Sequence, residues 1–479
     1  MPVVVTGRDL TRAELVRVAR DGDQVRLDPA ALAHMAEARR VVEERLAAGD
    51  PIYGGSTGVG VLKRTAIDLT AAAEQSRRII GQHLIAQGDH AAPEVVRATM
   101  LRLANGFAAG YPGVRPVLAE RLVEALNANN VPGVRILGSV GQSDLGQMAE
   151  IAAAIFGGQP LLPGEGLALV SSNAFSTAAA ALAIDDTAML IGSLEVAGAC
   201  SLEGLAANPS LLHPAIADAR PYPGLQASLA NLRALLDGSA LFATGRARAL
   251  QDPLSFRNLP QIQGACRDAL THADAQLAIE LNASQGNPMV VLAERSVASV
   301  ANFESLPMAA VLDYLRIVQA SAIGAAAERS IKLLDTPWSG LPTGLTPSGD
   351  PSDPGLAYLG IAAQSIAAEA RLLAAPVSFE LVSTAHAEGI EDRMSLTPLA
   401  ARRLTEMTRL GARVAAIELA VATQATELRG TAPRGTGTSR AGVFVRRHVP
   451  YLAVAGPVPD LEALAEAIQR GEILKAARA

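Results

Sequence analysis

The sequence has few cysteines, few aromatic side chains and few charges. Its 479 residues include two cysteines, 3% aromatic residues and 18% charged residues. Cys200 and Cys266 are far apart and form no Cys-X-X-Cys or Cys/His ligand spacing, which argues against a zinc site and a disulfide framework. We therefore predict that the protein binds no metal and is located in the reducing cytoplasm.

An excess of positive charge is also missing. The chain has 41 Lys and Arg residues against 47 Asp and Glu residues, which gives a formal net charge of -6. Proteins that bind nucleic acid generally need a basic surface to neutralise phosphates. The charge balance therefore argues against nucleic acid as a partner.

Long hydrophobic runs of the kind that cross a membrane are scarce. The N-terminal apolar run covers only residues 3–5 and is followed by Arg8 and Asp9, so we expect no signal peptide. Residues 167–184 carry no charge, but they include serine, threonine and asparagine. We interpret this segment as buried in a soluble protein and not as a membrane span.

The sequence is instead rich in aliphatic segments with helical periodicity, and apolar residues make up 49% of it. Helices are predicted over residues 31–48, 91–106, 113–127, 143–156, 167–205, 307–335, 355–374 and 398–428. Strand signals are limited to residues 3–5 and 24–27. Gly/Pro-rich stretches interrupt the pattern at 53–60, 209–224, 336–355 and 430–442. The pattern predicts a mainly helical protein with a central bundle and large subunit interfaces.

A glycine-rich run, Tyr53-Gly-Gly-Ser-Thr-Gly-Val-Gly60, stands out near the N-terminus. It completes neither a GxGxxG nor a Walker pattern, so nucleotide binding is not expected. A tyrosine that opens a flexible loop suits a general base on a mobile lid, provided that its pKa is lowered. The alternative is an ordinary surface turn, and the local sequence leaves both open.

Three other polar positions also have more than one interpretation. His83 follows an apolar helix and is either structural or catalytic. Arg257 is suited to bind a substrate carboxylate or to cap a helix C-terminus. Glu391, followed by Asp392 and Arg393, is locally typical of a solvated charge cluster. On the residues alone, the sequence predicts an oligomeric helical enzyme or binding protein and specifies no reaction.

Seven short segments follow one another along nearly the whole chain. They are Tyr53-Gly-Gly-Ser-Thr-Gly-Val-Gly60, Gly138-Ser-Val-Gly141, Glu165-Gly-Leu-Ala-Leu169, Gln251-Asp-Pro-Leu-Ser-Phe-Arg257, Glu280-Leu-Asn-Ala-Ser-Gln-Gly-Asn-Pro288, Asn302-Phe303 and Glu391-Asp-Arg-Met-Ser395. In this order they resemble the YGxNTGxG, GSxGASGDL, EGLAL, QDxYSxRxxPQ, ExNSxxDNP, NFHG and QEDHxSM motifs of the histidine, phenylalanine and tyrosine ammonia-lyase family. The resemblance implies the mainly α ammonia-lyase fold, which is similar to that of fumarase and aspartase. That fold has a long central helical bundle and a smaller N-terminal α+β part that carries the active-site loop.

Members of that family use methylidene-imidazolone, an electrophile formed from an internal Ala-Ser-Gly. Its formation requires the unhindered amide nitrogen of the glycine to attack the alanine carbonyl. The corresponding segment here reads Gly141-Gln142-Ser143-Asp144-Leu145, is one residue shorter and has no glycine after the serine. We therefore predict that Gln142, Ser143 and Asp144 form a residual cofactor segment without imidazolone, and that the protein has no cofactor.

Two further departures affect the same chemistry. Ser171 aligns with the family's asparagine after EGLAL, and Leu254 aligns with its QDxY tyrosine. Tyr53, His83, Arg257, Phe303 and Glu391 keep the residue types of the family, and the resemblance assigns the role of catalytic base to Tyr53. It assigns substrate binding to His83, Arg257, Phe303, Glu391, Asn282 and Gln251.

We interpret this pattern as altered chemistry: a lyase that eliminates an amine from an amino-acid-like substrate without imidazolone. The expected leaving group is trimethylamine from an aromatic or imidazole betaine, as in the ergothionase-like lyases that resemble this family. Glu391, and Asp144 in the vacated cofactor space, would offer negative charge to the substrate cation. Two alternatives stay open: an ordinary histidine or aromatic ammonia-lyase, and an inactive family member that binds an amino-acid-like ligand.

Asp144 also has a structural interpretation, in which Ser143 caps the following helix and Asp144 adds charge to its first turn. The resemblance further implies a homotetramer in which each active site draws on three subunits. We divide the chain into residues 1–200, which carry the Tyr53 loop and the residual cofactor segment within 138–147, and residues 201–479, which form the central bundle and C-terminal helices. Together these parts are expected to form one structural unit.

Overall fold

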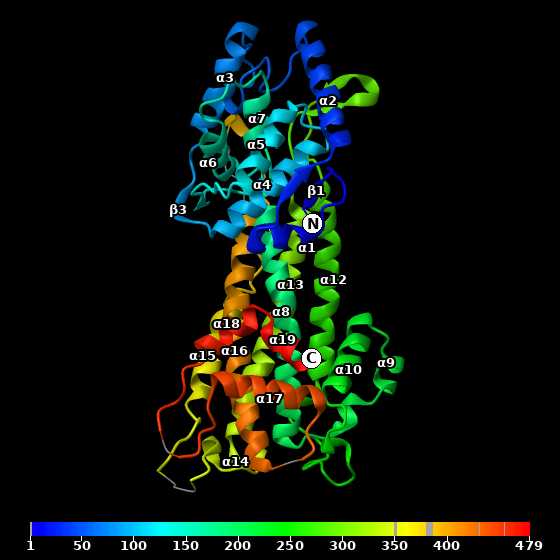
Figure 1. Cartoon of the computed structure of the whole chain (residues 1–479), viewed down its shortest axis with the longest axis vertical. Helices are drawn as coiled ribbons and strands as arrows, with labels where there is room; N and C mark the ends of the chain where they lie inside the picture. Colours follow the sequence, from blue (N-terminus) through cyan, green and yellow to red (C-terminus); the bar gives the residue numbers. More distant parts are fainter. Residues whose placement is uncertain (1, 349–351, 380–386, 431, 455) are drawn as a thin grey trace. The chain divides into compact units, whose positions relative to one another are not determined.

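The computed structural model describes residues 2–348, 352–379, 387–430, 432–454 and 456–479. Helices dominate the described residues, and their strands form three two-stranded sheets (Figure 1). The predicted mainly helical class is confirmed. By internal contacts the chain divides into two compact units, each assembled from three stretches of sequence.

The first unit comprises Met1–Asp185, Asp274–Leu312 and Pro376–Arg402, and it mixes helices with strands. Its strands are β1 (Val3–Val5), parallel to β2 (Val25–Leu27); β3 (Gln87–His90), antiparallel to β4 (Arg135–Leu137); and β5 (Met289–Val291), antiparallel to β6 (Ser296–Ala298). Its complete helices are α1 (Arg12–Val16), α2 (Pro29–Ala47), α3 (Leu69–Gln82), α4 (Pro93–Ala108), α5 (Pro116–Asn127), α6 (Leu145–Phe156) and α7 (Glu165–Val170).

The second unit comprises Asp186–Ala273, Asp313–Ala375 and Arg403–Ala479 and is helical. Its complete helices are α9 (Ala215–Ala219), α10 (Pro223–Leu235), α11 (Leu254–Arg257), α14 (Thr336–Ser339), α15 (Leu359–Leu372), α17 (Thr436–His448), α18 (Glu462–Gln469) and α19 (Glu472–Arg478). The long helices that contribute residues to both units are α8 (Ala174–Leu205), α12 (Leu259–Asn282), α13 (Leu306–Leu334) and α16 (Thr397–Arg429). The division predicted at residue 200 falls inside α8.

Prolines begin several helices of the first unit. Pro29, Pro93 and Pro116 are the first residues of α2, α4 and α5. Proline suits this position because its fixed φ matches the helix and its missing N–H would have no partner in the first turn. The amphipathic segments predicted at 31–48, 91–106 and 113–127 do form helices. Each helix begins two or three residues away from its predicted first residue.

The single helix predicted over 167–205 is wrong. The structure has two helices, α7 and α8, because Ser171 leaves the helical region with ψ 76° and the chain resumes at Ala174. The helix predicted from residue 143 begins at Leu145. The Gly/Pro-rich stretch 430–442 contains the start of α17, whose Gly437 lies against Leu235 and so leaves no room for a larger side chain.

The apolar composition of the long helices is explained by burial within the protein. Among the described residues, Glu165–Leu205 and Leu306–Leu334 are long and apolar enough to cross a membrane, and 89% of the apolar window of the first is buried. The second unit also encloses an ion pair between Arg329 of α13 and Glu418 of α16, both at most 1% exposed. Ser201 of α8 donates a further hydrogen bond to Glu418 at 2.7 Å. A buried charge pair needs such additional partners to offset its loss of hydration.

Candidate active site

The residual cofactor segment is held by parts of the first unit that are distant in sequence. The Gly141 carbonyl accepts hydrogen bonds from Ser305 Oγ at 3.1 Å and Ser395 Oγ at 3.0 Å. Gly141 has φ +84°, and a Cβ at this position would collide with Ser395 Oγ. The glycine is therefore required by both the backbone conformation and the close approach of Ser395.

Ser143 is buried and has a left-handed backbone conformation, with φ +67°. Its N–H donates to Asn173 Oδ1 at 2.8 Å, and its hydroxyl lies 3.3 Å from the Ser171 hydroxyl. Non-glycine residues adopt this conformation only where surrounding contacts impose it. The segment between α7 and α8 supplies those contacts.

The Asp144 carboxylate is fully buried and is directed at the start of α8. It accepts hydrogen bonds from Ser139 Oγ at 2.8 Å and from the Ser176 N–H and hydroxyl at 2.8 and 2.9 Å. Burial raises the pKa of Asp144, and these hydrogen bonds lower it, leaving it above its ordinary value. The carboxylate therefore caps α8 in three dimensions, although it is remote from that helix in sequence.

This finding corrects the structural interpretation of Asp144. Asp144, not Ser143, occupies the N-cap position of α6, and neither its side chain nor that of Ser143 caps that helix. The helix that its carboxylate stabilises is α8. Both carboxylate oxygens already accept hydrogen bonds from protein donors, so any interaction of Asp144 with a quaternary ammonium would be an electrostatic one.

The residues present do not fit imidazolone formation. Ring closure needs a free amide nitrogen on the residue after the serine, directed at the carbonyl of the residue before it. Here that nitrogen belongs to Asp144, and it donates to the Ser172 carbonyl at 2.8 Å. Closure would break this bond and also move the buried Asp144 carboxylate from the start of α8.

The Tyr53 loop folds back on itself through its tyrosine. The Tyr53 hydroxyl accepts the Gly60 N–H at 2.9 Å. Burial raises the pKa of Tyr53, the hydrogen bond from Gly60 lowers it, and the negative charge of Glu391 raises it further, so the pKa lies above its ordinary value. Lys63, which follows the loop, forms an ion pair with Glu388 at 2.9 Å. The structure thus brings two predicted site residues, Tyr53 and Glu391, into one electrostatic environment.

His83 is the residue at which α3 ends, and it is half-buried. Its Nδ1 lies 2.7 Å from the Ile79 carbonyl oxygen. A carbonyl only accepts, so Nδ1 carries the proton and Nε2 is left as an acceptor in the neutral ring. His83 therefore has both a structural bond and an acceptor nitrogen for a substrate.

Phe303 is half-buried, and its carbonyl accepts a hydrogen bond from Asn173 Nδ2 at 2.5 Å. The next residue, Glu304, was not predicted as a site residue. Its Oε2 accepts from Gln142 Nε2 at 3.1 Å and lies 3.5 Å from Arg393 Nη2. Glu304 thus links the residual cofactor segment to Arg393. The signal available in the sequence was its position directly after Asn302-Phe303.

Asn282 lies in the framework of the fold. Its Oδ1 accepts the Leu10 N–H at 2.9 Å, and its Nδ2 donates to the carbonyls of Leu10 and Ala278 at 3.0 Å. Both amide hydrogens are therefore used, which leaves none for the predicted contact with a substrate. The conformation of the N-terminal segment at Leu10 depends on this side chain.

Gln251 and Arg257 belong to the second unit, and both side chains are exposed. Arg257 is the last residue of the short helix α11. Two leucines beside it, Leu250 and Leu254, are 83% and 60% exposed. The turn that carries the predicted carboxylate-binding arginine therefore exposes two large apolar side chains in the single chain.

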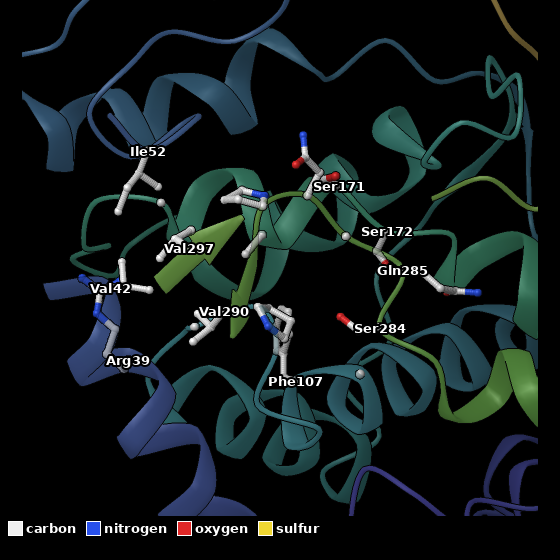
Figure 2. Close-up of a pocket in the computed structure, with 18 of the residues that line it drawn as sticks. Arg39, Val42, Ile52, Phe107, Ser171, Ser172, Ser284, Gln285, Val290 and Val297 are labelled. Atoms are coloured by element: carbon white, nitrogen blue, oxygen red, sulfur yellow. The ribbon is translucent and has the colours of Figure 1, made fainter. Parts of the chain in front are cut away.

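The first unit contains a cavity that is lined in part by Ser171 and Ser172, the residues between α7 and α8 (Figure 2). It encloses about 620 Å³ of empty space, part of it open to solvent, and Ser171 and Ser172 line it together with Ile52, Val290 and Phe107. No predicted site residue is among its lining residues in the described part of the chain. The same described residues contain no group of three or more His, Cys, Asp or Glu side chains able to hold a metal ion.

Comparison with known proteins identifies the family. The model of the aromatic amino acid lyase family matches residues 10–162 and 158–447. This chain belongs to the aromatic amino acid lyase family. Histidine ammonia-lyase from Symbiobacterium thermophilum is 34% identical over 505 aligned residues, which cover 100% of this chain and 99% of that protein. Histidine ammonia-lyase from Deinococcus radiodurans is 32% identical, with 99% and 95% covered.

Solved structures of the aromatic amino acid lyase fold match the whole chain. Ergothionase from Treponema denticola has a TM-score of 0.91 at 27% identity and covers 100% of this chain and 99% of its own. Tyrosine aminomutase from Streptomyces globisporus has a TM-score of 0.93 at 28% identity, with 100% and 98% covered. The predicted ammonia-lyase fold is confirmed, and with it the assignment to a family of carbon–nitrogen lyases that normally use methylidene-imidazolone.

Proposed function

We propose that this family member eliminates trimethylamine from the betaine of an aromatic or imidazole amino acid without methylidene-imidazolone. The product would be the corresponding α,β-unsaturated acid. The similarity to ergothionase supports the proposal at the level of the fold. The exact side chain of the substrate is left to experiment.

One observation carries the proposal: the Asp144 amide nitrogen and carboxylate are both engaged in holding the segment against α8. Without the electrophile, an ammonium group is a poor leaving group, because it loses a proton as the pH rises. A quaternary ammonium cannot lose a proton, and it departs as a neutral amine. The altered segment therefore favours a substrate whose nitrogen needs no activation.

The proposed reaction is an α,β-elimination with Tyr53 as base. The Tyr53 phenolate takes the β-proton, the electrons of that C–H bond form the C=C bond, and the C–N electrons leave with trimethylamine. Arg257 binds the substrate carboxylate, and His83 and Phe303 contact its side chain. The elimination written in this way requires no cofactor.

The expected lowering of the Tyr53 pKa is wrong for the free protein: the pKa is raised, so less of the phenolate is present near neutrality than for an ordinary tyrosine. A bound quaternary ammonium would bring a positive charge close to the phenol and so lower its pKa. Glu391 has a double effect, since its charge favours the cation but disfavours the phenolate. We propose that the substrate's own charge helps to activate the base.

We also propose that the enzyme is a cytoplasmic homotetramer with shared active sites. Gln251 and Arg257 lie in the second unit, whereas Tyr53 and His83 lie in the first. The exposed Leu250 and Leu254 beside Arg257 favour contact of this turn with another copy of the chain. In such a tetramer Arg257 of one copy would serve the Tyr53 loop of another.

The proposal is tested by incubating the protein with histidine, phenylalanine and tyrosine and with their trimethylated betaines. Trimethylamine, ammonia and the unsaturated acids are measured in the same samples. We expect trimethylamine from at least one betaine and no ammonia from the parent amino acids. Ammonia release would favour an ordinary ammonia-lyase, the activity named for the curated relatives. Binding without turnover would favour an inactive family member.

A further inference from the structure

Asn173 connects the residual cofactor segment to the predicted aromatic wall of the site. It lies directly before α8 and is 1% exposed. Its Oδ1 accepts the Ser143 N–H at 2.8 Å, and its Nδ2 donates to the Phe303 carbonyl at 2.5 Å. One buried amide thus joins three segments that are remote in sequence.

The position of Asn173 is itself well fixed. Its own carbonyl accepts the Thr177 N–H at 2.9 Å in the first turn of α8. The same turn is capped by Asp144 through Ser176. A short side chain with few rotamers on a capped helix start is suited to hold other groups in place.

The contacts that accompany Asn173 are of a different kind. Gln142 binds Glu304 through a partly exposed side-chain pair, and Ser305 binds the Gly141 carbonyl. Gln142 and Glu304 also form an isolated antiparallel β-bridge, so the two segments are paired through their backbones at this point. Next to this bridge, Asn173 accepts a hydrogen bond from the Ser143 N–H and donates one to the Phe303 carbonyl.

We propose that Asn173 is a positioning residue of the reaction. It holds the Phe303 backbone at a fixed place relative to Ser143, and it thereby sets the position of the aromatic ring that contacts the substrate. This inference rests on the proposed function for the role of Phe303. The hydrogen-bonded link itself is independent of which substrate is turned over.

Two substitutions of Asn173 distinguish its hydrogen bond with the Ser143 N–H from its hydrogen bond with the Phe303 carbonyl. Asn173→Asp keeps an acceptor oxygen for the Ser143 N–H, but its ionised form has no donor for the Phe303 carbonyl and also adds a buried charge, an effect that the control must share. Asn173→Ala removes both bonds. Asn105→Asp is the matched control, because Asn105 is 0% exposed, accepts the Gly7 N–H at 2.9 Å and donates to the Leu281 carbonyl at 2.9 Å.

Hydrogen exchange of the intact protein tests the link without any substrate. Asn173→Asp should accelerate exchange in residues 302–306 by about 10-fold, the equivalent of one lost hydrogen bond, while Ser143 stays protected. Asn173→Ala should also expose Ser143, and Asn105→Asp should change neither. Unchanged exchange at 302–306 in Asn173→Asp, or an equal rise in Asn105→Asp, would overturn the proposal.

Kinetics with a betaine that the wild type converts tests the role in the reaction. Asn173→Asp should raise KM about 10-fold with a smaller change in kcat, as expected when binding geometry is lost. Its effect on kcat/KM should not add to that of Phe303→Ala, because both act through the same ring. Asn105→Asp should be additive with Phe303→Ala, and additivity for Asn173→Asp would overturn the positioning role.

The two measurements also separate this inference from the proposed function. If no betaine reacts with the wild type, the proposed function fails. Hydrogen exchange then still decides whether Asn173 holds Phe303 to the segment.

Discussion

The Asp144 carboxylate caps the first turn of α8 through Ser176, whose N–H and hydroxyl both donate to Oδ2. Asp144→Asn replaces one carboxylate oxygen by an NH₂ group that cannot accept these bonds. We expect a loss of about 1–3 kcal/mol in the free energy of unfolding, measured by denaturant titration. Asp68→Asn, at the exposed N-cap of α3, is the control and should cost less. Equal losses at the two positions would contradict a buried structural role for Asp144.

The difference in stability between the wild type and Asp144→Asn should depend on pH in a defined direction. Burial raises the pKa of Asp144 in the folded protein, so the folded state retains a proton that the unfolded state has released. Stability linked to this group is complete below the unfolded pKa of about 4 and is lost as pH rises through the raised folded value. The stability advantage of the wild type over Asp144→Asn should therefore shrink as pH rises from 4 to 7. An advantage that grows over this range would contradict the raised pKa.

Replacing the proposed base has a specific signature. Tyr53→Phe should reduce kcat by about 100-fold or more, while KM changes little because the ring remains. Tyr111→Phe, at an exposed tyrosine of the same unit, should leave kcat unchanged. Full activity of the Tyr53 variant on a converted substrate would rule out Tyr53 as base.

The charge of Glu391 should be visible in the pH profile. Because this charge raises the pKa of Tyr53, Glu391→Gln should shift the limb on which kcat/KM rises with pH to lower pH. Glu388→Gln removes a nearby surface charge that is paired with Lys63, and it should leave the limb in place. A shift to higher pH in Glu391→Gln would show that Tyr53 is not the titrating base.

Shared active sites can be tested by complementation. Tyr53→Phe and Arg257→Ala should each be nearly inactive as pure proteins. If the two residues meet from different copies, random mixed tetramers should regain about one quarter of wild-type activity. The activity of mixtures is compared before and after dissociation and reassembly. No gain on reassembly would mean that both residues serve a site within one chain.

Sequence patterns were informative about elements whose signals are local. The amphipathic periodicity of α4 and α5 predicted helices close to their observed bounds, although the starts at Pro93 and Pro116 were missed by two or three residues. Residues 171–173 were less predictable, because the break between α7 and α8 depends on partners that are distant in sequence. Asp144 and Ser143 are two of these partners.

The roles of residues in the candidate site were also hard to predict where they depend on partners distant in sequence. The resemblance predicts Tyr53, His83 and Phe303 as site residues, but spacing alone gave no sign that Asn282 is used by the N-terminal segment at Leu10. Such hydrogen bonds are set by the packed fold, so the residue type alone did not distinguish a framework amide from a substrate-binding one. The same applies to Asn173, whose partners come from two remote segments.

The mass of the intact purified protein tests the central claim most directly. Imidazolone formation removes two water molecules from the chain, whereas a segment held by Asp144 and Ser172 should remain uncyclised. The account predicts a mass equal to that encoded by the 479 residues, after allowance for removal of the initiator methionine. A deficit of two water molecules would contradict it and identify the protein as an imidazolone-dependent lyase.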